Sequence, residues 1–374
     1  MKQLRKIFFW LHLTAGVLAG IFIFTMCVTG ALLAFESNIL QVAEREMRVI
    51  PMSPENSPRL SIREIIAKAQ MAKPNSKPSA VTLQSDTSAA AIVAFGRDGQ
   101  IFINPYNGEI TGEGASGWRG FFRAVQDAHR WLTLSGDVRP IGKNINDAAN
   151  VLFLFLACSG LYIWFPRRLA WQNFKSILWF RRGLRDRARY FNWHNTIGFW
   201  SSLVLIVLTT TAVVMSYNWA NNLLYTLTGN EPPQQQANPQ GEQPPFVLPE
   251  NIDALWAKAE NHTAWKSIAL RFPITKDSAV FTIDEAKYWN RFGRSTLTID
   301  AKTAEIAKWE SYGEQNSGRQ LRSWTRFTHT GETGGIVGQF IAFAASVGGA
   351  FLVWTGFSLA LRRFRGWRKG RMEN

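Results

Sequence analysis

Histidine is scarce in this chain of 374 residues, and four of its five copies stand in matching contexts. His12, in WLHLTAG, and His194, in NWHNTIG, each lie near the start of a long apolar run and are followed four residues later by glycine. His129, in DAHRWL, and His329, in FTHTGETGG, each precede another such run, and only His262 falls outside the pattern. The sequence thus contains two pairs of similarly placed imidazoles.

Two imidazoles that face each other can bind a haem iron, one from each side of the ring. Zinc also accepts imidazole, but it requires three or four clustered ligands, whereas a helix from His12 to Phe35 would separate its ends by roughly 35 Å. The remaining alternative is an interfacial hydrogen-bonding role. The repetition argues against it, because ionisable groups in membrane spans are costly and usually functional. The pattern favours two bis-histidine haems, His12 with His194 and His129 with His329.

The cysteines limit how such a haem would be held. Cys27 and Cys158 are the only two in the chain, and both fall inside apolar runs. The sequence therefore has no disulfide framework and no Cys-x-x-Cys-His attachment motif. We expect any haem to be bound without a covalent link, as haem b.

Four apolar runs without Asp, Glu, Lys or Arg could position these histidines. Each has 18 or more residues, and a helix needs about 20 to cross a bilayer. The first run is too long for a signal-peptide core and has no convincing cleavage site, so we expect it to be retained. The chain is predicted to form four membrane helices, within Trp10–Phe35, Ala148–Phe165, Thr196–Tyr217 and Ile336–Leu361.

Basic residues predict the orientation of these helices. The start of the chain, the connector after the second run and the tail hold 17 Lys and Arg against two acidic residues, Asp186 and Glu373, and account for the net charge of +15. Four crossings put all three segments on one side, and the positive-inside rule makes that side cytoplasmic. Topology explains this charge without nucleic-acid binding. We expect a bacterial inner-membrane protein with both termini in the cytoplasm and its long segments in the periplasm.

The periplasmic segments have the patterns of small α+β lobes. LSIREIIAKAQ has a helical period, while AVTLQ, AAIVAF and QIFINPYNGEI read as strands. The Pro/Gln-rich stretch 229–246 reads as a flexible loop. The expected division is 1–36 for membrane helix one, 37–125 for lobe one, 126–166 for an interfacial helix and membrane helix two, 167–193 for a basic loop, 194–218 for membrane helix three, 219–325 for lobe two, 326–362 for membrane helix four and 363–374 for a basic tail.

An internal repeat relates the two halves of the chain. Residues 101–110 match 297–306, and residues 141–168 match 337–364, both at the same offset. Each copy consists of a span, an outer lobe and a second span. Both copies start on the same side, so the repeats are parallel and a pseudo-twofold axis along the membrane normal is expected. A group held jointly by the two copies would lie near that axis.

The order of these motifs resembles the PepSY-associated transmembrane family. The resemblance covers nearly the whole chain and rests on NPYNGEITG, DAHRWL, SGLYIWFPRR, NWHNTIGFW, THTGETGG and TGFSLALRR. Within that family the chain is similar to inner-membrane ferrisiderophore reductases of the FoxB type. The resemblance implies PepSY-like periplasmic lobes, two haems b per chain ligated by the four paired histidines, and reductive release of iron from a ferric siderophore.

Several further residues follow as candidates. Basic side chains within a few residues of the histidines could pair with haem propionates, although solvated interfacial charge is the alternative for each: Arg130, Arg322, Arg326, Arg5 and Arg189. Lobe aromatics could contact a large chelate, with core packing as their alternative: Tyr106, Trp118, Tyr288 and Trp289. Some relatives carry a fused flavodoxin or flavin reductase module. This sequence has no nucleotide-binding glycine motif, so we expect a separate electron donor. The basic segments could bind an acidic donor protein. Alternatively, they could bind anionic lipid.

Two other functions fit the same residues. A b-type cytochrome could pass quinol electrons to another periplasmic acceptor. Alternatively, the lobes could form a sensory or inhibitory module that the spans merely anchor. A reduced-minus-oxidised absorption spectrum separates the anchor from the redox functions, and the response to ferric chelates separates the two redox functions.

Overall fold

The computed structural model describes residues 2–50, 57–166, 171–233, 246–274, 278–288, 290 and 292–372. Arg167, Arg168, Trp289 and most of the Pro/Gln-rich stretch lie outside these residues. The chain divides into a helical unit, residues 1–36, 122–232 and 321–374, and a sheet unit, residues 37–121 and 233–320. Residues 219–232, expected in the second lobe, fall in the helical unit.

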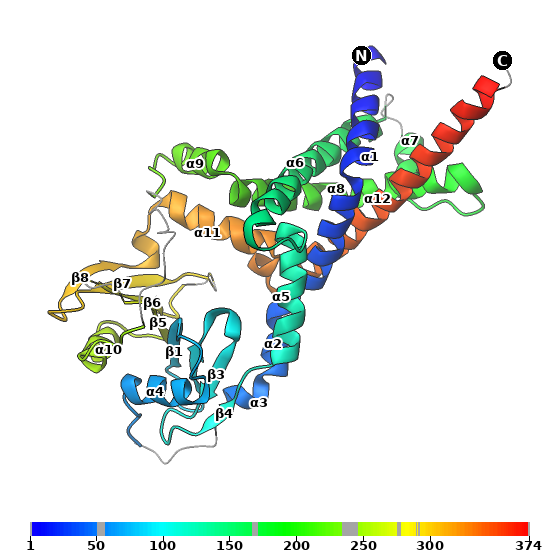
Figure 1. Cartoon of the computed structure of the whole chain (residues 1–374). Helices are drawn as coiled ribbons and strands as arrows, with labels where there is room; N and C mark the ends of the chain where they lie inside the picture. The colour runs from blue at the N-terminus through cyan, green and yellow to red at the C-terminus, as the bar shows by residue number, and fades with distance from the viewer. Residues whose placement is uncertain are drawn as a thin grey trace. The chain divides into compact units, whose positions relative to one another are not determined.

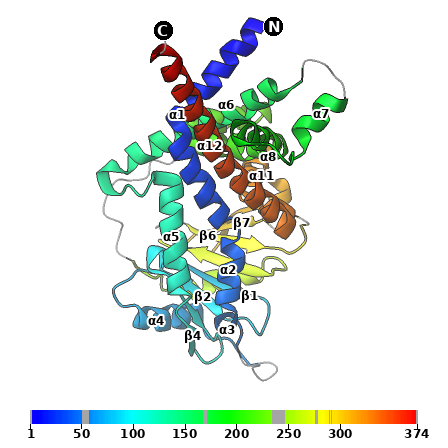
Figure 2. The same ribbon diagram turned by 90° about the vertical axis from the view of Figure 1, so that its right-hand side faces the viewer.

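The four predicted membrane helices are present in the helical unit. They are α1 (Lys2–Leu33), α6 (Arg139–Trp164), α8 (Asp186–Ser216) and α12 (Gly335–Met372), and all four are long and apolar enough to cross a membrane. α1 packs against α6 and α12, and α8 packs against the same two helices. The two repeats therefore meet along α1–α12 and along α6–α8, and Figure 2 shows the first of these crossings.

Glycines allow α1 and α12 to approach closely. A Cβ atom at Gly20 would lie 2.5 Å from the Phe357 ring, and one at Gly349 would lie 2.6 Å from the Cys27 sulfur. Small residues commonly permit such contacts between membrane helices, where no hydrophobic drive favours association. Any larger residue at either position would separate the helices or displace these side chains.

Short helices flank the four long ones. In the helical unit, α7 (Trp171–Leu178) precedes α8, and α9 (Asn218–Leu227) follows α8 after one extended residue, Tyr217. Two helices, α5 (Ser116–Trp131) and α11 (Ser317–His329), run from the sheet unit into the helical unit.

α1 begins and α12 ends at the same end of the helical unit (Figure 1), which we call the terminal end. The opposite end is called the distal end.

The sheet unit is built on eight antiparallel strands in the order β4-β3-β2-β1-β5-β6-β7-β8. The strands are β1 (Ala80–Gln84), β2 (Ala91–Ala94), β3 (Gln100–Ile103), β4 (Ile110–Gly112), β5 (Ser267–Arg271), β6 (Ala279–Asp284), β7 (Ser295–Ile299) and β8 (Ile306–Glu310). The other described helices of this unit are α2 (Glu36–Ala43), α3 (Arg45–Arg48), α4 (Ile62–Ala72), α10 (Ile252–Glu260) and the 3-10 turns Gly96–Asp98 and Tyr312–Glu314. Alternate residues of β1, β5 and β7 are buried, which is the period expected of a half-buried strand.

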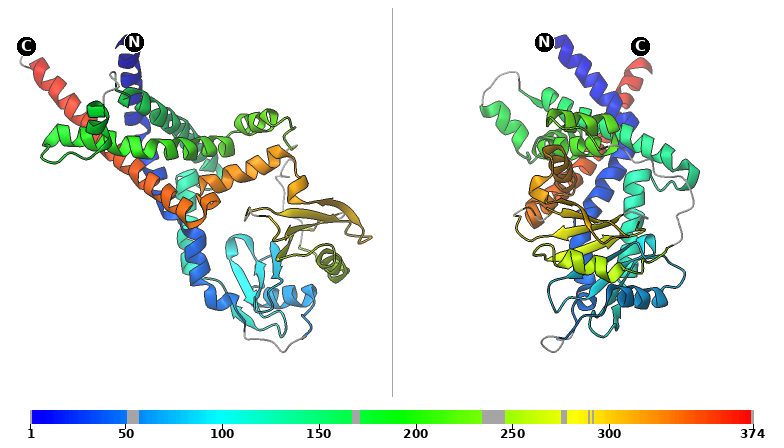
Figure 3. Two further views of the ribbon diagram at one scale, coloured as in Figure 1. Left: turned by 180° about the vertical axis from the view of Figure 1, so that it is seen from behind. Right: turned by 90° about the vertical axis from the view of Figure 1, so that its left-hand side faces the viewer.

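The two lobes expected from the sequence share one sheet and one core. β1 and β5 pair at its centre, with Ala80 opposite Arg271 and Gln84 opposite Ser267. α4 and α10 pack against each other, and the buried residues of both halves form a single apolar cluster, as Figure 3 helps to follow. If β1 and β5 did not pair, each would be an edge strand with a row of unpaired backbone N–H and C=O groups. Their pairing removes these two edges and leaves β4 and β8 as the edge strands.

The repeat is visible in the details of this sheet. The ladder between β3 and β4 shifts register at Phe102/Ile103, and the ladder between β7 and β8 shifts at Thr298/Ile299, which are the equivalent positions of the second copy. The turn after β3 carries Gly108 at φ +74°, and the turn after β7 carries Ala304 at φ +57°. The two halves of the sheet therefore have the same local construction.

A buried carboxylate ties several segments of the sheet unit together. Glu44 is fully buried and accepts hydrogen bonds from Arg119 Nε, from Arg48 Nη2 at 2.6 Å and from the Ala115 backbone N–H at 3.3 Å. Burial alone would raise the pKa of Glu44, but the hydrogen bonds from Arg119 and Arg48 outweigh it and hold the pKa below its usual value. The carboxylate is thus ionised and holds α3 to the start of α5.

Candidate functional site

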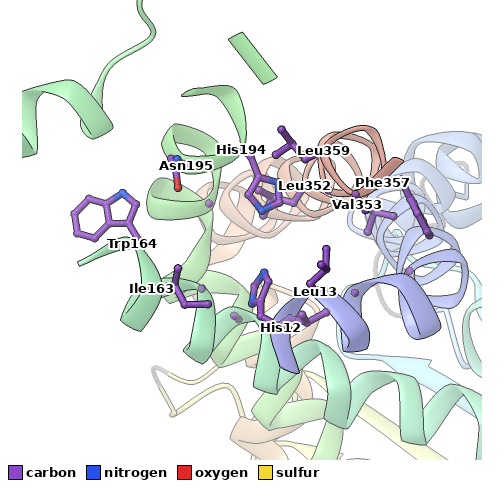
Figure 4. A pocket seen from close by; sticks show the side chains of 18 of the residues that line it. His12, Leu13, Ile163, Trp164, His194, Asn195, Leu352, Val353, Phe357 and Leu359 are labelled. Atoms are coloured by element: carbon purple, nitrogen blue, oxygen red, sulfur yellow. The ribbon is translucent and has the colours of Figure 1, made fainter. Parts of the chain in front are cut away.

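His12 and His194 lie in one pocket at the terminal end of the four-helix bundle. His12 comes from α1 and His194 from α8, and their rings point toward each other in Figure 4. All four long helices line the pocket, mostly with apolar side chains and glycines. We call His12 and His194 the terminal pair. The structure brings these two residues, one from each repeat, to the same pocket.

His129 and His329 form a second pair at the distal end. His129 is in the last turn of α5 and His329 is the last residue of α11. Their ring centroids are 6.4 Å apart and the rings are inclined by 51°. Two metal–imidazole bonds of about 2.0–2.1 Å, with the ring radius added on each side, place the centroids roughly 6.3 Å apart. The spacing of this distal pair therefore fits one metal ion held between two imidazoles.

Each of the four rings is held through Nδ1 by a hydroxyl on a long helix. His12 Nδ1 is 2.8 Å from Ser159 Oγ, and His194 Nδ1 is 2.8 Å from Thr355 Oγ1. His129 Nδ1 is 2.8 Å from Thr29 Oγ1. His329 Nδ1 is 3.2 Å from Oγ1 of Thr211 and 2.9 Å from the backbone oxygen of Leu208. The nitrogen left for a metal is Nε2 in every case.

Sequence reasoning missed these hydroxyls, although the repeat carries a signal for them. Ser159 and Thr355 occupy equivalent positions of the two copies, at the offset that relates the matching segments 141–168 and 337–364. Thr29 and Thr211 are separated by the same interval as His12 and His194, so they too are equivalent in the aligned first spans. The two copies therefore place a hydroxyl residue at the same two positions.

Glycines lie against three of the four imidazoles. A Cβ atom at Gly160 would be 3.4 Å from His12 Cε1, and one at Gly356 would be 3.5 Å from His194 Cε1. At the distal pair, a Cβ atom at Gly30 would be 3.4 Å from His129 Cε1. Each ring thus rests against bare helix backbone, and residues larger than alanine would push it away.

The basic residues around the terminal pair differ from those predicted. Arg187 and Arg363 line the pocket, whereas Arg5 and Arg189, both among the described residues, are absent from its lining. Arg5 donates from Nη2 to the Ile163 carbonyl at the end of α6. Arg189 lies over an aromatic ring instead, 5.5 Å from the centroid of Trp193. Of the described arginines, Arg187 and Arg363 are therefore those placed to bind an anion in this pocket.

Four arginines gather near the distal pair. Burial and the nearby charges of Arg139 and Arg326 lower the pKa of Arg130. Burial and Arg326 likewise lower the pKa of Arg322, which donates from Nε to Asn221 Oδ1 at 2.9 Å. The predicted Arg130, Arg322 and Arg326 thus share one electropositive region with Arg139, and such a region favours an anionic ligand.

The lobe aromatics divide into packed and exposed residues. Tyr106 packs against the small cluster around Phe102. The ring of Tyr288 lies edge-to-face with that of Tyr312, with the centroids 5.2 Å apart, and its hydroxyl accepts from the Gly313 N–H. Tyr106 and Tyr288 therefore have structural roles. Trp118 is 48% exposed on α5 and is the aromatic of the predicted set that a solute could reach. Trp289 lies outside the described residues.

Among the described residues, no larger metal cluster competes with the two pairs. No three His, Cys, Asp or Glu side chains in this part of the chain are grouped closely enough to hold an ion. His262 stands apart in the sheet unit, 4.5 Å from the ring of Trp309. The described histidines therefore offer two-imidazole sites, which suit a metal that brings its remaining ligands with it.

Comparison with known families agrees with this architecture. No curated protein matches the chain. The family model of the PepSY-associated TM region matches residues 9–363, which include both histidine pairs and the whole sheet. The chain belongs to the PepSY-associated transmembrane family.

Proposed function

We propose that this protein is a di-haem b oxidoreductase that carries electrons across the bacterial inner membrane and reduces a periplasmic ferric chelate, releasing Fe(II). The observation that carries the proposal is the existence of two imidazole pairs at opposite ends of one membrane bundle. Haem, when bound at each pair, supplies one-electron transfer. The residues of this chain determine where such groups sit and what surrounds them.

The separation of the pairs suits transfer across a bilayer. α1 carries both His12 and Thr29, the partner of His129, while α8 carries both His194 and Thr211, the partner of His329. His12 and Thr29 are as far apart on α1 as His194 and Thr211 are on α8. At 1.5 Å per residue, each histidine is separated from the threonine on its helix by about 26 Å along the helix axis. This length is close to the roughly 30 Å of a hydrocarbon core. The terminal pair and the distal pair therefore lie near the two membrane surfaces.

The surroundings of each pair suit a flat apolar group with anionic edges. Apolar side chains and glycines line the terminal pocket, with Arg187 and Arg363 at its charged positions. The distal pair has the electropositive region of Arg130, Arg139, Arg322 and Arg326 beside it. Guanidinium groups form strong paired hydrogen bonds with carboxylates such as haem propionates. Arg187 and Arg363 replace Arg5 and Arg189 in this role.

The chemical step is a one-electron reduction of the substrate. With haem held at both pairs, an electron from a separate donor would enter at the terminal pair, cross to the distal pair and reduce the ferric ion of the chelate to Fe(II). Fe(II) is held more weakly than Fe(III) by hard oxygen ligands, so the metal is released. The positive-inside rule places the terminal pair on the cytoplasmic side and the distal pair on the periplasmic side. The identity of the siderophore is left open by these residues.

The test is spectroscopic and uses the purified full chain. We expect a pyridine haemochrome assay to give two haems b per polypeptide. We also expect an anaerobically pre-reduced sample to reoxidise when a ferric chelate is added. Protein without haem would refute the redox function and favour the membrane-anchored sensory or inhibitory module. Haem that quinol reduces but no ferric chelate reoxidises would favour the b-type cytochrome.

A further inference from the structure

The four hydroxyls that contact the imidazoles carry an inference about the haem sites, which rests on the proposed function. We propose that Ser159, Thr355, Thr29 and Thr211 fix the haem-binding imidazoles as Nδ1–H tautomers and, as hydrogen-bond acceptors, lower the midpoint potentials of the two haems. They are positioning residues, because each acts through a histidine.

Counting protons gives the direction of these hydrogen bonds. A threonine hydroxyl has one proton. Thr29 Oγ1 donates to the Thr25 carbonyl at 2.6 Å, and Thr355 Oγ1 donates to the Phe351 carbonyl at 2.8 Å. Thr211 Oγ1 is 2.8 Å from the Val207 carbonyl. A threonine that donates to the carbonyl four residues earlier has only lone pairs for other contacts, so the imidazole must be the donor.

His329 gives an independent indication of the same tautomer. Its Nδ1 lies 2.9 Å from the Leu208 carbonyl, which can only accept. A proton on Nδ1 satisfies this contact, and the Nε2 lone pair then remains for a metal. The hydroxyl of Ser159 also donates to a backbone carbonyl, that of Leu156, but this contact is longer, at 3.4 Å. The three threonines are therefore the clearer examples.

The repeats divide this task evenly. Each histidine and its hydroxyl partner belong to the same copy, as for His12 with Ser159 and His194 with Thr355. The two histidines of a pair come from different copies, so each site receives one hydroxyl from each copy. Both histidines of a pair are therefore held alike, and the two pairs have separate hydroxyl partners.

An Nδ1–H that donates to a fixed acceptor makes the imidazole a better electron donor to a bound metal. Greater donation stabilises Fe(III) over Fe(II) and lowers the midpoint potential. The hydroxyl that accepts from Nδ1–H also donates its own proton to a backbone carbonyl. This second hydrogen bond makes the hydroxyl oxygen a stronger acceptor, because hydrogen bonds in a chain polarise one another. Removing the hydroxyl should therefore raise the potential of the haem concerned.

The experiment compares Thr355→Val and Thr29→Val in the haem-loaded full chain. Valine keeps the shape of threonine and removes the hydroxyl, which is both the acceptor for the imidazole and the donor to the backbone carbonyl. We expect Thr355→Val to raise the midpoint potential of the haem at the terminal pair alone, and Thr29→Val to raise that of the haem at the distal pair alone, in a potentiometric titration followed by absorbance. Thr355→Ser and Thr29→Ser should restore the wild-type potentials, because serine returns the hydroxyl.

Thr209→Val is the matched control. Thr209 is buried on α8, and its hydroxyl lies 2.7 Å from the Leu205 carbonyl and 3.2 Å from the Ile206 carbonyl. Thr29, Thr211 and Thr355 have the same two kinds of backbone contact, but each of them also contacts an imidazole. Unchanged potentials in Thr355→Val and Thr29→Val, as in Thr209→Val, would overturn the inference while leaving the di-haem function intact. A shift that serine fails to restore would also overturn it. Wild-type protein without haem would refute the proposed function itself.

Discussion

Under the proposed function, replacing His194 with alanine should abolish one of the two haem sites and leave the other unchanged. The substitution removes one of the two imidazoles of the terminal pair, together with its Nδ1 contact to Thr355 Oγ1. Thr211, which contacts His329 of the distal pair, is about 26 Å from His194 along α8, by the rise of 1.5 Å per residue. Sites further apart than about 7–10 Å, without shared partners, usually respond independently. We therefore expect the low-spin signal of one haem to disappear and the haem content to fall from two per chain toward one.

Electron paramagnetic resonance of the oxidised protein and a pyridine haemochrome assay measure this outcome. His329→Ala should remove the other low-spin signal, and the double variant should have neither. His262→Ala is the control, since His262 lies in the sheet unit against Trp309 and should retain both haems. Equal weakening of both signals in a folded His194→Ala protein would refute the assignment of ligands to terminal and distal pairs.

Three further predictions test other parts of the structure. Because Arg187 and Arg363 line the terminal pocket, Arg187→Gln with Arg363→Gln should weaken haem retention at the terminal pair in a haem-transfer assay, whereas Arg189→Gln should not. Glu44→Gln should destabilise the sheet unit by about 3 kcal/mol, the lower end for breaking a buried ion pair, in thermal unfolding monitored by circular dichroism. Because the pKa of Glu44 is lowered in the folded protein, its contribution to the free energy of unfolding is fully present above the pKa of the unfolded carboxyl. That contribution is lost as the pH falls through the pKa of Glu44 in the folded protein. The stability of the wild type should therefore decline in acid, and that of the variant should decline less. Leu270→Ala, at a fully buried position of β5, should cost about 2–5 kcal/mol and lower a single unfolding transition of the shared sheet, whereas two separate transitions would contradict one common core.

The sequence was most informative about features that can be read along the chain, namely apolar runs and the internal repeat. The four membrane helices follow from uninterrupted apolar runs, because a bilayer admits long apolar helices and little else. The pairing of His12 with His194 followed from the repeat, because two parallel copies place equivalent residues at the same depth. Neither inference required knowledge of how distant segments pack.

The joining of the two lobes depends on a contact that no local pattern reveals. Val81 and Leu270 pair across the centre of the sheet, although each strand alone reads only as a half-buried strand with an open edge. Strand pairing is chosen by the fold, and segments distant in the chain carry no mark of their partners. The sequence therefore supported two small lobes, and the structure shows one sheet.

Nearness in sequence was a poor guide to the arginines, and helix geometry explains why. At 3.6 residues per turn, a residue five positions before His194 points about 140° away from it, whereas one seven positions before lies within about 20°. Arg189 is five positions before His194 and lies over Trp193, while Arg187 is seven positions before it and lines the pocket. Arg363 follows the same rule, seven positions after Gly356, which rests against the His194 ring. Arg5 is also seven positions before His12, but its guanidinium caps the Ile163 carbonyl. Spacing on a helix thus selects the face, and the hydrogen-bonding needs of a nearby helix end decide whether the charge remains free for a ligand.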